Sequence, residues 1–500
     1  MECRKKISSD IIIDIRRSLL QRFGWLADLY MIDFFVDNHW DRLPSSWKAV
    51  LENLEPSDWY DVLSDIRQQS NTLKHVLPLS FICLRILIEA VSLRRRAVNG
   101  LKEFAEACHI KDENLPNCFP CSENCNQLRV KVKLKKQHEI DRICYAIELL
   151  QGTIVDVGAG VGHLSRQIAV RFAHSAYPLR VITIEADQKL VQKAAQLDSM
   201  LRRTLSRHRS NNAKCDGETD VELPERRALF LEPGQKLDGC GNVNVNTTRC
   251  VIGLHTCGDL SSFIVREFIV DRTAKALLHF GCCYHKLGGG KDKPFMQNWI
   301  DDISSEDERA CDSKGGGFPM SAAYANFSLS YAARELSCHA IELFRAKLRE
   351  KCNANEYRIH CFRAILEWLI VKMSRRNDKA FQKFEMNFRH QGFRSVKAEY
   401  LTSFAAYIKA ALANKAQLYD EIMIMLEKQP SLTDEIDEML CRWRRTLAVY
   451  CIRLIIAKLI ETVILDDRRC FVEEQGYDAY LVPLFDPQIS ARNIALVCLK

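Results

Sequence analysis

The amino-acid sequence predicts an α/β protein with a doubly wound, mostly parallel sheet and helical regions before and after most of it in the chain. Short apolar runs alternate with amphipathic stretches of helical period through the middle of the chain, which is typical of a parallel sheet. A glycine-rich turn over residues 158–162 follows the first apolar run and opens a helix. Two more apolar runs close the chain, so they are predicted to complete the sheet as an antiparallel strand pair.

The first part of the chain divides into three regions. Residues 1–98 place apolar side chains at helical spacing and are predicted to be all-helical, with one helix starting near Ser45. Residues 99–130 lose this period and contain prolines and cysteines, so a linker loop is predicted there. The sheet core follows over residues 131–325 and contains the first five strands. A polar insertion loop that could carry the third of them is predicted at about 206–249.

The second part of the chain returns to helices and then to strands. Residues 326–465 have helical spacing again and are predicted to be a helical region inserted before the last strands. Residues 466–500 contain the two closing strands, with a turn near Pro487.

The composition limits the class of protein. The 500 residues are 47% hydrophobic and 27% charged, which is typical of a folded chain of more than one domain. The net charge of +7 suits a polyanionic partner without requiring one. No apolar run reaches the length of about 18 residues that a membrane helix needs, and the N-terminus does not resemble a secretory signal. The 21 cysteines are therefore expected to be reduced, and the protein is expected in the cytoplasm or nucleus, neither secreted nor in a membrane.

The glycine-rich turn predicts a nucleotide-like cofactor. Glycines allow backbone amides to approach a ligand, and the following helix N-terminus adds positive potential. A dinucleotide site would need a third glycine at position 163, which is His163 here. Asp156 suits a ligand that carries a cation, and Glu185 ends the next strand, where a carboxylate binds ribose hydroxyls. We therefore predict S-adenosyl-L-methionine as the cofactor; the cofactor-binding residues are Asp156, Gly158, Ala159, Gly160, Gly162 and Glu185.

Polar residues follow two later apolar strands, at the edge where a doubly wound sheet binds its ligands. The two motifs are His-Thr-Cys-Gly-Asp at 255–259 and Cys-Cys-Tyr-His at 282–285. The alternative interpretation is that their cysteines and histidines only pack the strand ends, as buried cysteines often do. We predict that this edge orients or deprotonates the methyl acceptor; the candidate catalytic residues are His255, Asp259, Tyr284 and His285.

Several segments resemble a known family. They read DVGAGVGHLSRQIA, VIGLHTCGDLS, FGCCYHKL, GFPMSAAYANFSLSYAARELSCHA and PLFDPQISARN. They are similar to methyltransferase-like proteins named for a ribosomal RNA adenine dimethylase domain, over residues 135–500 and at DNHWDRLPSSW near the N-terminus. The resemblance implies a Rossmann-like class I methyltransferase core that binds S-adenosylmethionine at Asp156, Gly158, Gly160 and Glu185. The two strand-end motifs also resemble, more briefly, a group of transfer RNA 2′-O-methyltransferases.

RNA is the predicted substrate of this S-adenosylmethionine-dependent methyltransferase. Basic side chains concentrate in Arg129–Lys136 and in Arg202–Arg209, where they could neutralise phosphates. Enzymes that methylate an adenine amine usually carry an Asn/Asp-Pro-Pro-aromatic turn, and this chain has none, so a ribose hydroxyl is the predicted acceptor. The alternatives are a protein methyltransferase or an inactive cofactor-binding scaffold that serves as an assembly partner. A protein partner is open, and so is the oligomeric state.

A cysteine group in the predicted linker raises a metal hypothesis. Cys118, Cys121 and Cys125, with Cys108 and His109 upstream, offer the ligand types that zinc prefers. The spacing lacks the second Cys-x-x-Cys of a typical zinc pattern, so reduced thiols are the favoured interpretation and no metal ligand is assigned.

Overall fold

The computed structural model describes most of the chain in two compact units. The described residues are 9–65, 75–112, 115–117, 119, 132–150, 152–173, 179–211, 221–232, 248–288, 316–349, 354–374 and 396–500. Unit 1 comprises Met1–Ser92, Gly290–Ala310 and Leu329–Glu461, and unit 2 comprises Leu93–Gly289, Cys311–Ser328 and Thr462–Lys500. The two helical regions that the sequence separates, before and after the sheet core, thus fall in one unit.

Unit 2 contains a seven-stranded sheet in the order β3-β2-β1-β4-β5-β7-β6. The strands are β1 (Thr153–Val157), β2 (Val181–Glu185), β3 (Glu225–Ala228), β4 (Arg249–Cys257), β5 (Ala274–Cys282), β6 (Asp478–Pro483) and β7 (Ile494–Leu499). The first five pair in parallel, and β7 pairs antiparallel with both β5 and β6. The predicted fold class, including the return of the C-terminus to the sheet, is therefore confirmed.

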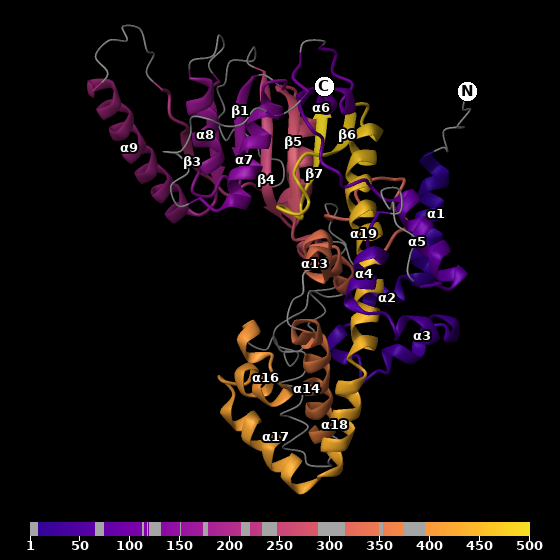
Figure 1. The fold of residues 1–500 in the computed structure, drawn as a ribbon. Coiled ribbons are helices and arrows are strands. Elements are labelled where there is room, and N and C mark those ends of the chain that lie inside the picture. Colours follow the sequence, from indigo (N-terminus) through magenta and orange to yellow (C-terminus); the bar gives the residue numbers. More distant parts are fainter. Residues whose placement is uncertain are drawn as a thin grey trace. The chain divides into compact units, whose positions relative to one another are not determined.

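Helices cover both faces of this sheet (Figure 1). They are α6 (Leu101–Ala107), α7 (Leu134–Ile147), α8 (His163–Phe172), α9 (Gln188–Asn211), α10 (Asp259–Val270), the short 3₁₀ helix η5 (Tyr284–Lys286) and the end of α19 (Trp443–Glu474). One apolar core joins α6, α7 and α8 to alternate strand residues such as Ile154 and Ile252. A second core joins α10 and α19 to the intervening residues, such as Val155 and Val251. The alternation follows from the period of two in a strand and buries both faces.

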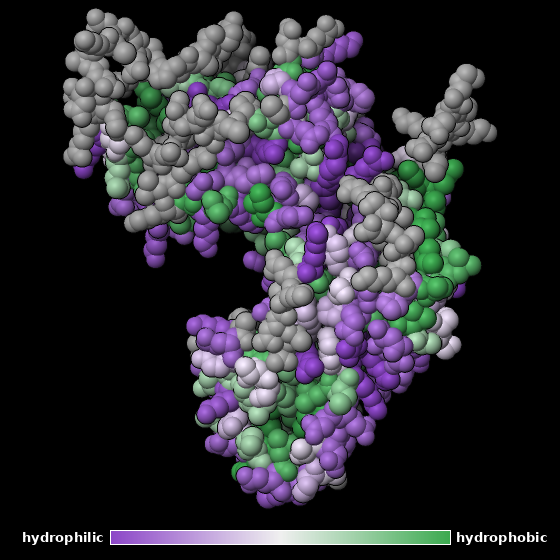
Figure 2. All heavy atoms as spheres, in the orientation of Figure 1, coloured by the Kyte–Doolittle hydropathy of each residue, from purple (hydrophilic) through white to green (hydrophobic). Residues whose placement is uncertain are grey.

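Unit 1 is helical, as predicted for its two regions. Its α-helices are α1 (Ser9–Phe23), α2 (Trp25–Asp28), α3 (Ser45–Leu51), α4 (Pro56–Val62), α5 (Leu79–Val91), α12 (Tyr331–Leu336), α13 (Ile341–Arg349), α14 (Ile359–Ser374), α16 (Phe404–Ala411), α17 (Ala416–Lys428), α18 (Ser431–Cys441) and the first part of α19. Its 3₁₀ helices are η1 (Met31–Asp33), η2 (His39–Arg42), η6 (Ala354–Arg358) and η7 (Ala398–Tyr400). Apolar side chains remain exposed on α1 and α5, among them Ile11, Leu79 and Ile86 (Figure 2).

The segment predicted to be a linker loop, 99–130, differs from the prediction in its first part. Helix α6 forms there because Leu101, Phe104 and Ala105 are buried at helical spacing, and Phe104 belongs to the apolar core on one face of the sheet. The prolines and cysteines that suggested a loop lie after this helix, and Cys118, Cys121 and Cys125 lie outside the described residues. Most of the predicted insertion loop, 206–249, also lies outside them, although β3 starts within it. Among the described helices, none is long and apolar enough to cross a membrane.

Candidate active site

The glycine turn between β1 and α8 uses backbone conformations that favour glycine. Gly158, Gly160 and Gly162 all have positive φ, at 72°, 58° and 73°. A Cβ added to Gly160 would meet no described atom within 4 Å, so the space in front of this residue is open to a ligand. The amide of Gly160 donates a hydrogen bond of 2.8 Å to Oε2 of Glu185, which brings the two predicted cofactor elements together.

Asp156 lies at the buried end of this site. Its side chain is 3% exposed, and its Oδ2 has no hydrogen-bond partner among the described residues. Burial raises the pKa of Asp156 to about 6, although Lys136 and Arg226 oppose this shift by their positive charge. A buried carboxylate oxygen without a partner fits the cationic group of S-adenosylmethionine, and the open space at Gly160 fits the rest of the ligand.

Gly162 has a structural role that the sequence does not reveal. A Cβ at Gly162 would lie 2.2 Å from Nη1 of Arg226, so a side chain here would displace this guanidinium in addition to adopting an unfavourable φ. Arg226 binds Asp198 on α9 through Nε and Nη2, at 2.8 and 3.0 Å, and Ser165 through Nη1 at 2.9 Å.

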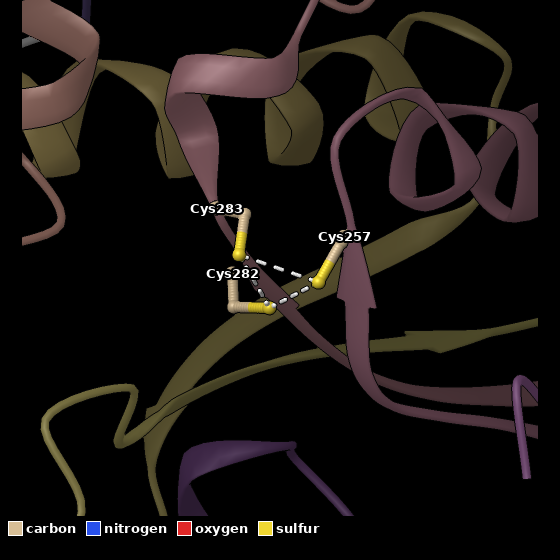
Figure 3. Close-up of side chains that lie close together, drawn as sticks. All are labelled: Cys257, Cys282 and Cys283. Carbon is tan, nitrogen blue, oxygen red and sulfur yellow. Dashed lines mark hydrogen bonds between the residues drawn. The ribbon is translucent and has the colours of Figure 1, made fainter. Parts of the chain in front are cut away.

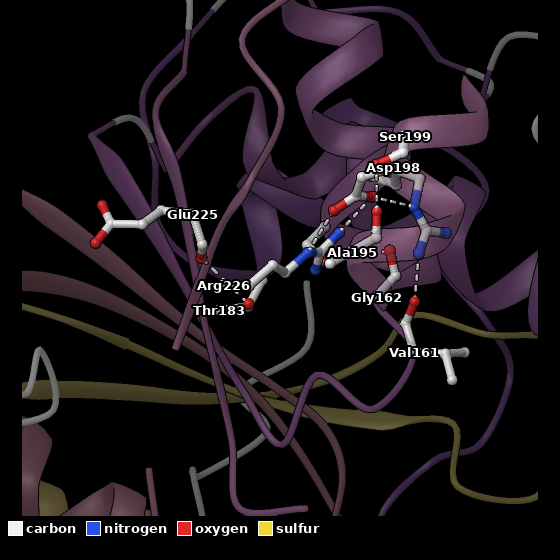
Figure 4. A network of polar contacts seen from close by, with 10 residues as sticks. Val161, Gly162, Thr183, Ala195, Asp198, Ser199, Glu225 and Arg226 are labelled. Carbon is white, nitrogen blue, oxygen red and sulfur yellow. Dashed lines mark hydrogen bonds and ion pairs between the residues drawn. The ribbon is translucent and has the colours of Figure 1, made fainter. Parts of the chain in front are cut away.

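Arg166 connects the same Asp198 carboxylate to the glycine turn. Nε of Arg166 donates to Oδ1 of Asp198 at 2.6 Å, and Nη2 of Arg166 donates to the carbonyl of Val161 (Figure 4). The Asp198 network therefore connects α8, α9 and β3 behind the turn. No local sequence pattern indicates its three charged residues.

His255 occupies an irregular point in β4. The pairing of β4 with β5 shifts between Leu254 and Thr256, so His255 has no partner residue in β5, and its φ is +63°. Such a bulge redirects a side chain and costs backbone energy in a residue other than glycine. Nε2 of His255 lies 2.9 Å from Oε1 and 3.1 Å from Oε2 of Glu139 on α7. Since a carboxylate only accepts, Nε2 carries the proton in the neutral ring, and Nδ1 carries the free lone pair.

Glu139 is a functional candidate that the sequence did not indicate. Its side chain is 1% exposed and also accepts a hydrogen bond from Ser490 at 2.8 Å. Burial opposes its charge, but the hydrogen bonds from His255 and Ser490 hold its pKa below the usual value. The preceding basic run makes it inconspicuous in the sequence, because a glutamate three residues after the lysines at 133–136 is typical of a solvated helix face.

Helix α7 links this pair to the cofactor end of the site. Lys136, three residues before Glu139, is half-buried and interacts electrostatically with both Glu139 and Asp156. Burial lowers the pKa of Lys136 against these two charges. Residues three apart share one helix face, so one face of α7 serves both the carboxylate at β1 and the histidine at β4.

The other three candidate catalytic residues lie elsewhere on the same edge. Asp259 accepts a hydrogen bond of 2.8 Å from the amide of Gly288. Tyr284 is buried, with the guanidinium groups of Arg468 and Arg492 over its ring at 5.8 and 5.5 Å from the centroid. His285 is half-buried in η5. Of the four candidates, His255 has a hydrogen bond to a buried carboxylate, and the catalytic roles of Asp259, Tyr284 and His285 stay predictions.

The cysteines of the two strand-end motifs converge. Cys257 and Cys282 are register partners at the ends of β4 and β5, and Cys283 follows directly. The Sγ of Cys257 lies 3.2 Å from that of Cys282 and 3.3 Å from that of Cys283 (Figure 3). The hydrogen bond from the Cys282 thiol lowers the pKa of Cys257 to about 5, against the effect of burial.

The predicted basic segments are described only in part. Lys133 is exposed, Lys135 forms a 3.7 Å ion pair with Glu139, and Lys136 is half-buried, whereas residues 129–131 lie outside the described part of the chain. Arg202 and Arg203 are exposed on α9, and the side chains of Arg207 and Arg209 lie outside the described residues. The exposed basic residues of the described chain therefore include Lys133, Arg202 and Arg203.

Comparison with known proteins agrees with this geometry. Residues 135–289 match a family described as a methyltransferase domain. The chain is 28% identical over 254 residues to a mouse (Mus musculus) protein named probable methyltransferase-like protein 25, and 26% identical over 265 residues to the human (Homo sapiens) protein of that name. Each match covers 50% of this chain but only 37% and 36% of the relative's length.

One solved structure was also matched. It is the magnesium protoporphyrin IX methyltransferase of Synechocystis PCC 6803 with bound SAH, at 19% identity, over 32% of this chain and 62% of that one. Its TM-score is 0.19, which is too low to show a common fold. The family match and the sheet topology show a class I methyltransferase domain, whose cofactor is S-adenosylmethionine. They support the resemblance to methyltransferase-like proteins, but not the more specific wording of a ribosomal RNA adenine dimethylase.

Proposed function

We propose that this protein transfers a methyl group from S-adenosylmethionine to a ribose hydroxyl of RNA. The observation that carries the proposal is the hydrogen-bonded pair of His255 and Glu139 near the end of β4, two strands in the sheet from Glu185, which ends β2. A hydroxyl gains from a general base before it attacks, and a histidine held by a buried carboxylate is suited to that task. An amine acceptor would need such a base less.

The residues of the site would bind the cofactor, remove the acceptor proton and contact RNA phosphates. Bound S-adenosylmethionine supplies an electrophilic methyl group at its sulfonium. Asp156 would hold the cationic amino acid end, and Glu185 the ribose hydroxyls, while Gly160 leaves room for close approach. Nδ1 of His255 would take the hydroxyl proton, and Glu139 would stabilise the imidazolium that forms. Exposed Lys133 and Arg202 would contribute phosphate contacts.

Labelling of cellular material tests the proposal. Total RNA and total protein from cells that lack the gene are incubated with tritiated S-adenosylmethionine and the purified chain, with Gly160→Val as the control that cannot bind cofactor. Label in RNA, recovered as a 2′-O-methylated nucleoside, supports the proposal. Label in protein would support a protein methyltransferase instead, and label in neither fraction would support an inactive scaffold. Label recovered as dimethyladenosine would contradict the ribose assignment.

A further inference from the structure

Three cysteine sulfurs meet at the carboxyl ends of β4 and β5 (Figure 3). The Sγ–Sγ distances are 3.2 Å for Cys257–Cys282, 3.3 Å for Cys257–Cys283 and 3.7 Å for Cys282–Cys283. Cys282 is buried, Cys283 is half-buried and Cys257 is exposed, so the group opens to solvent on one side. No histidine or carboxylate of the described residues joins it as a further ligand.

We propose that these three thiolates bind one zinc ion and leave its fourth coordination position open to solvent. Zinc–thiolate bonds of about 2.3 Å at the tetrahedral angle would separate the sulfurs by about 3.8 Å. The observed distances of 3.2, 3.3 and 3.7 Å lie below that value, so the sulfurs would move apart by at most about 0.6 Å to accept the ion. Three protein ligands with an open fourth position are typical of zinc sites that take part in chemistry.

Several residues in and beside the cysteine group have a positive φ. Of the described non-glycine residues, four have a positive φ, and two of these are at the sulfur cluster: Cys283, a member of it, at 44°, and His255, two residues before Cys257, at 63°. Gly258, next to Cys257, has a φ of 56°, and a Cβ there would lie 2.6 Å from the carbonyl oxygen of Lys286. Unfavourable backbone conformations that gather at one point indicate a functional constraint there.

The surrounding charges fit an anionic centre. Zn²⁺ binds all three sulfurs as thiolates, so the complex carries a net charge of −1. Lys286 lies near enough to favour the Cys257 thiolate electrostatically. Arg468 is fully buried and interacts with Cys282, and its Nε and Nη1 have no hydrogen-bond partner among the described residues. A negatively charged zinc–thiolate centre would supply a counter-charge for this buried guanidinium.

A disulfide is the competing arrangement for such thiols. It would bring one pair of sulfurs to about 2.05 Å and leave the third cysteine outside the bond. The three separations are instead similar to one another, which suits a shared ligand better than a single pair. The zinc proposal does not depend on the methyl acceptor or on turnover.

Metal analysis of the full chain tests the proposal. The protein is purified under reducing conditions without a histidine tag from zinc-supplemented cells, and its zinc is measured by plasma mass spectrometry. We expect about one zinc ion per chain from this site, and loss of about one equivalent in Cys257→Ser. Cys257 is exposed, so the serine variant should fold. Cys441→Ser, which removes an exposed cysteine in α18 of unit 1, should keep the zinc.

A second measurement does not depend on any variant. Cobalt(II) added to the metal-free wild-type chain should give the sulfur-to-metal charge-transfer and tetrahedral d–d absorption of a thiolate site, and Cys257→Ser should lose most of it. Equal zinc content and equal cobalt spectra in wild type and Cys257→Ser would overturn the proposal. A disulfide among these cysteines in freshly reduced, metal-treated protein would overturn it too. Cofactor binding, measured separately by calorimetry, reports on the methyltransferase assignment and not on the metal.

Discussion

Glu139 holds the imidazole of His255 through Nε2, at 2.9 and 3.1 Å from its two carboxylate oxygens, across 116 residues of sequence. The carboxylate is almost fully buried, while 29% of the histidine side chain is exposed. A buried acceptor fixes the ring orientation and the tautomer, and the partial exposure leaves the other face of the ring accessible.

Loss of this pair should slow methyl transfer without preventing cofactor binding. We expect His255→Ala to lower the kcat for RNA methylation on the order of 100-fold, which is the lower end of the rate contribution of a general base. Glu139→Gln should lower kcat with little change in KM, because it acts through the histidine. The thermal shift caused by S-adenosylmethionine should remain in both variants. An unchanged kcat in Glu139→Gln would contradict the positioning role.

Two glycines of the turn should respond differently to substitution. Gly160→Val places a side chain in open space, so the fold should lose only about 1–2 kcal/mol for the backbone conformation, while the stabilisation by S-adenosylmethionine should vanish. Gly162→Ala should destabilise the fold more, because its Cβ would displace the Arg226 guanidinium from its hydrogen bonds to Asp198 and Ser165. Thermal unfolding with and without ligand separates the two effects. A retained ligand shift in Gly160→Val would show that the cofactor binds elsewhere.

Binding of S-adenosylmethionine should weaken as the pH falls through about 6. Burial raises the pKa of Asp156 to about 6, and only the ionised carboxylate attracts the ligand's ammonium. Calorimetric titrations between pH 5 and pH 8, a range on the order of one to two units either side of that pKa, should show this dependence. Asp156→Asn should bind more weakly at every pH and lack the dependence.

The Asp156 carboxyl also makes the stability of the ligand-free protein depend on pH, in the direction opposite to ligand binding. A raised pKa in the folded state means that the fold prefers the protonated acid. The favourable contribution of the protonated Asp156 to folding is therefore fully present below the unfolded-state pKa of 3.8, and it is lost as the pH rises through about 6. Without ligand, Asp156→Asn should be more stable than wild type at pH 8, by at most about 3 kcal/mol. Chemical denaturation at pH 5 and pH 8 checks the sign.

Removal of the shared carboxylate behind the glycine turn should destabilise unit 2. Asp198→Asn leaves Arg166 and Arg226 without their buried counter-charge, which typically costs about 3–5 kcal/mol. Arg180→Gln, which breaks an exposed ion pair with Glu225, is the control and should cost less than about 1 kcal/mol. Equal losses in the two variants would show that the network contributes no more than a surface pair.

Exposed basic residues of unit 2 should contribute to RNA affinity. Lys133→Glu together with Arg202→Glu should weaken binding of single-stranded RNA and reduce the slope of log affinity against log salt, by roughly 0.7 for each lost phosphate contact. Lys428→Glu, at an exposed position of α17 in unit 1, is the control and should leave the salt slope unchanged, as a charge reversal away from the proposed RNA surface. An unchanged salt slope in the double variant would remove these residues from the proposed RNA surface.

The sequence by itself determined the sheet, its closing strands and the cofactor turn. These features follow from local patterns: β-branched runs such as residues 153–157, the glycines at 158–162, and a carboxylate at the end of the next strand. Helix α6 has no comparable local pattern, because three buried residues at helical spacing are too few to outweigh the prolines and cysteines that follow.

Only the tertiary structure decided which polar residues act together. Glu139 meets His255 because α7 packs against the sheet and a bulge in β4 turns the histidine, and neither event leaves a local sequence signal. Tyr284 lies next to the guanidinium groups of Arg468 and Arg492, which come from segments about 200 residues further along the chain. Cys257 meets Cys282 because parallel strands place their carboxyl ends at one edge. Such contacts depend on register and packing between distant segments, and these are properties of the folded chain alone.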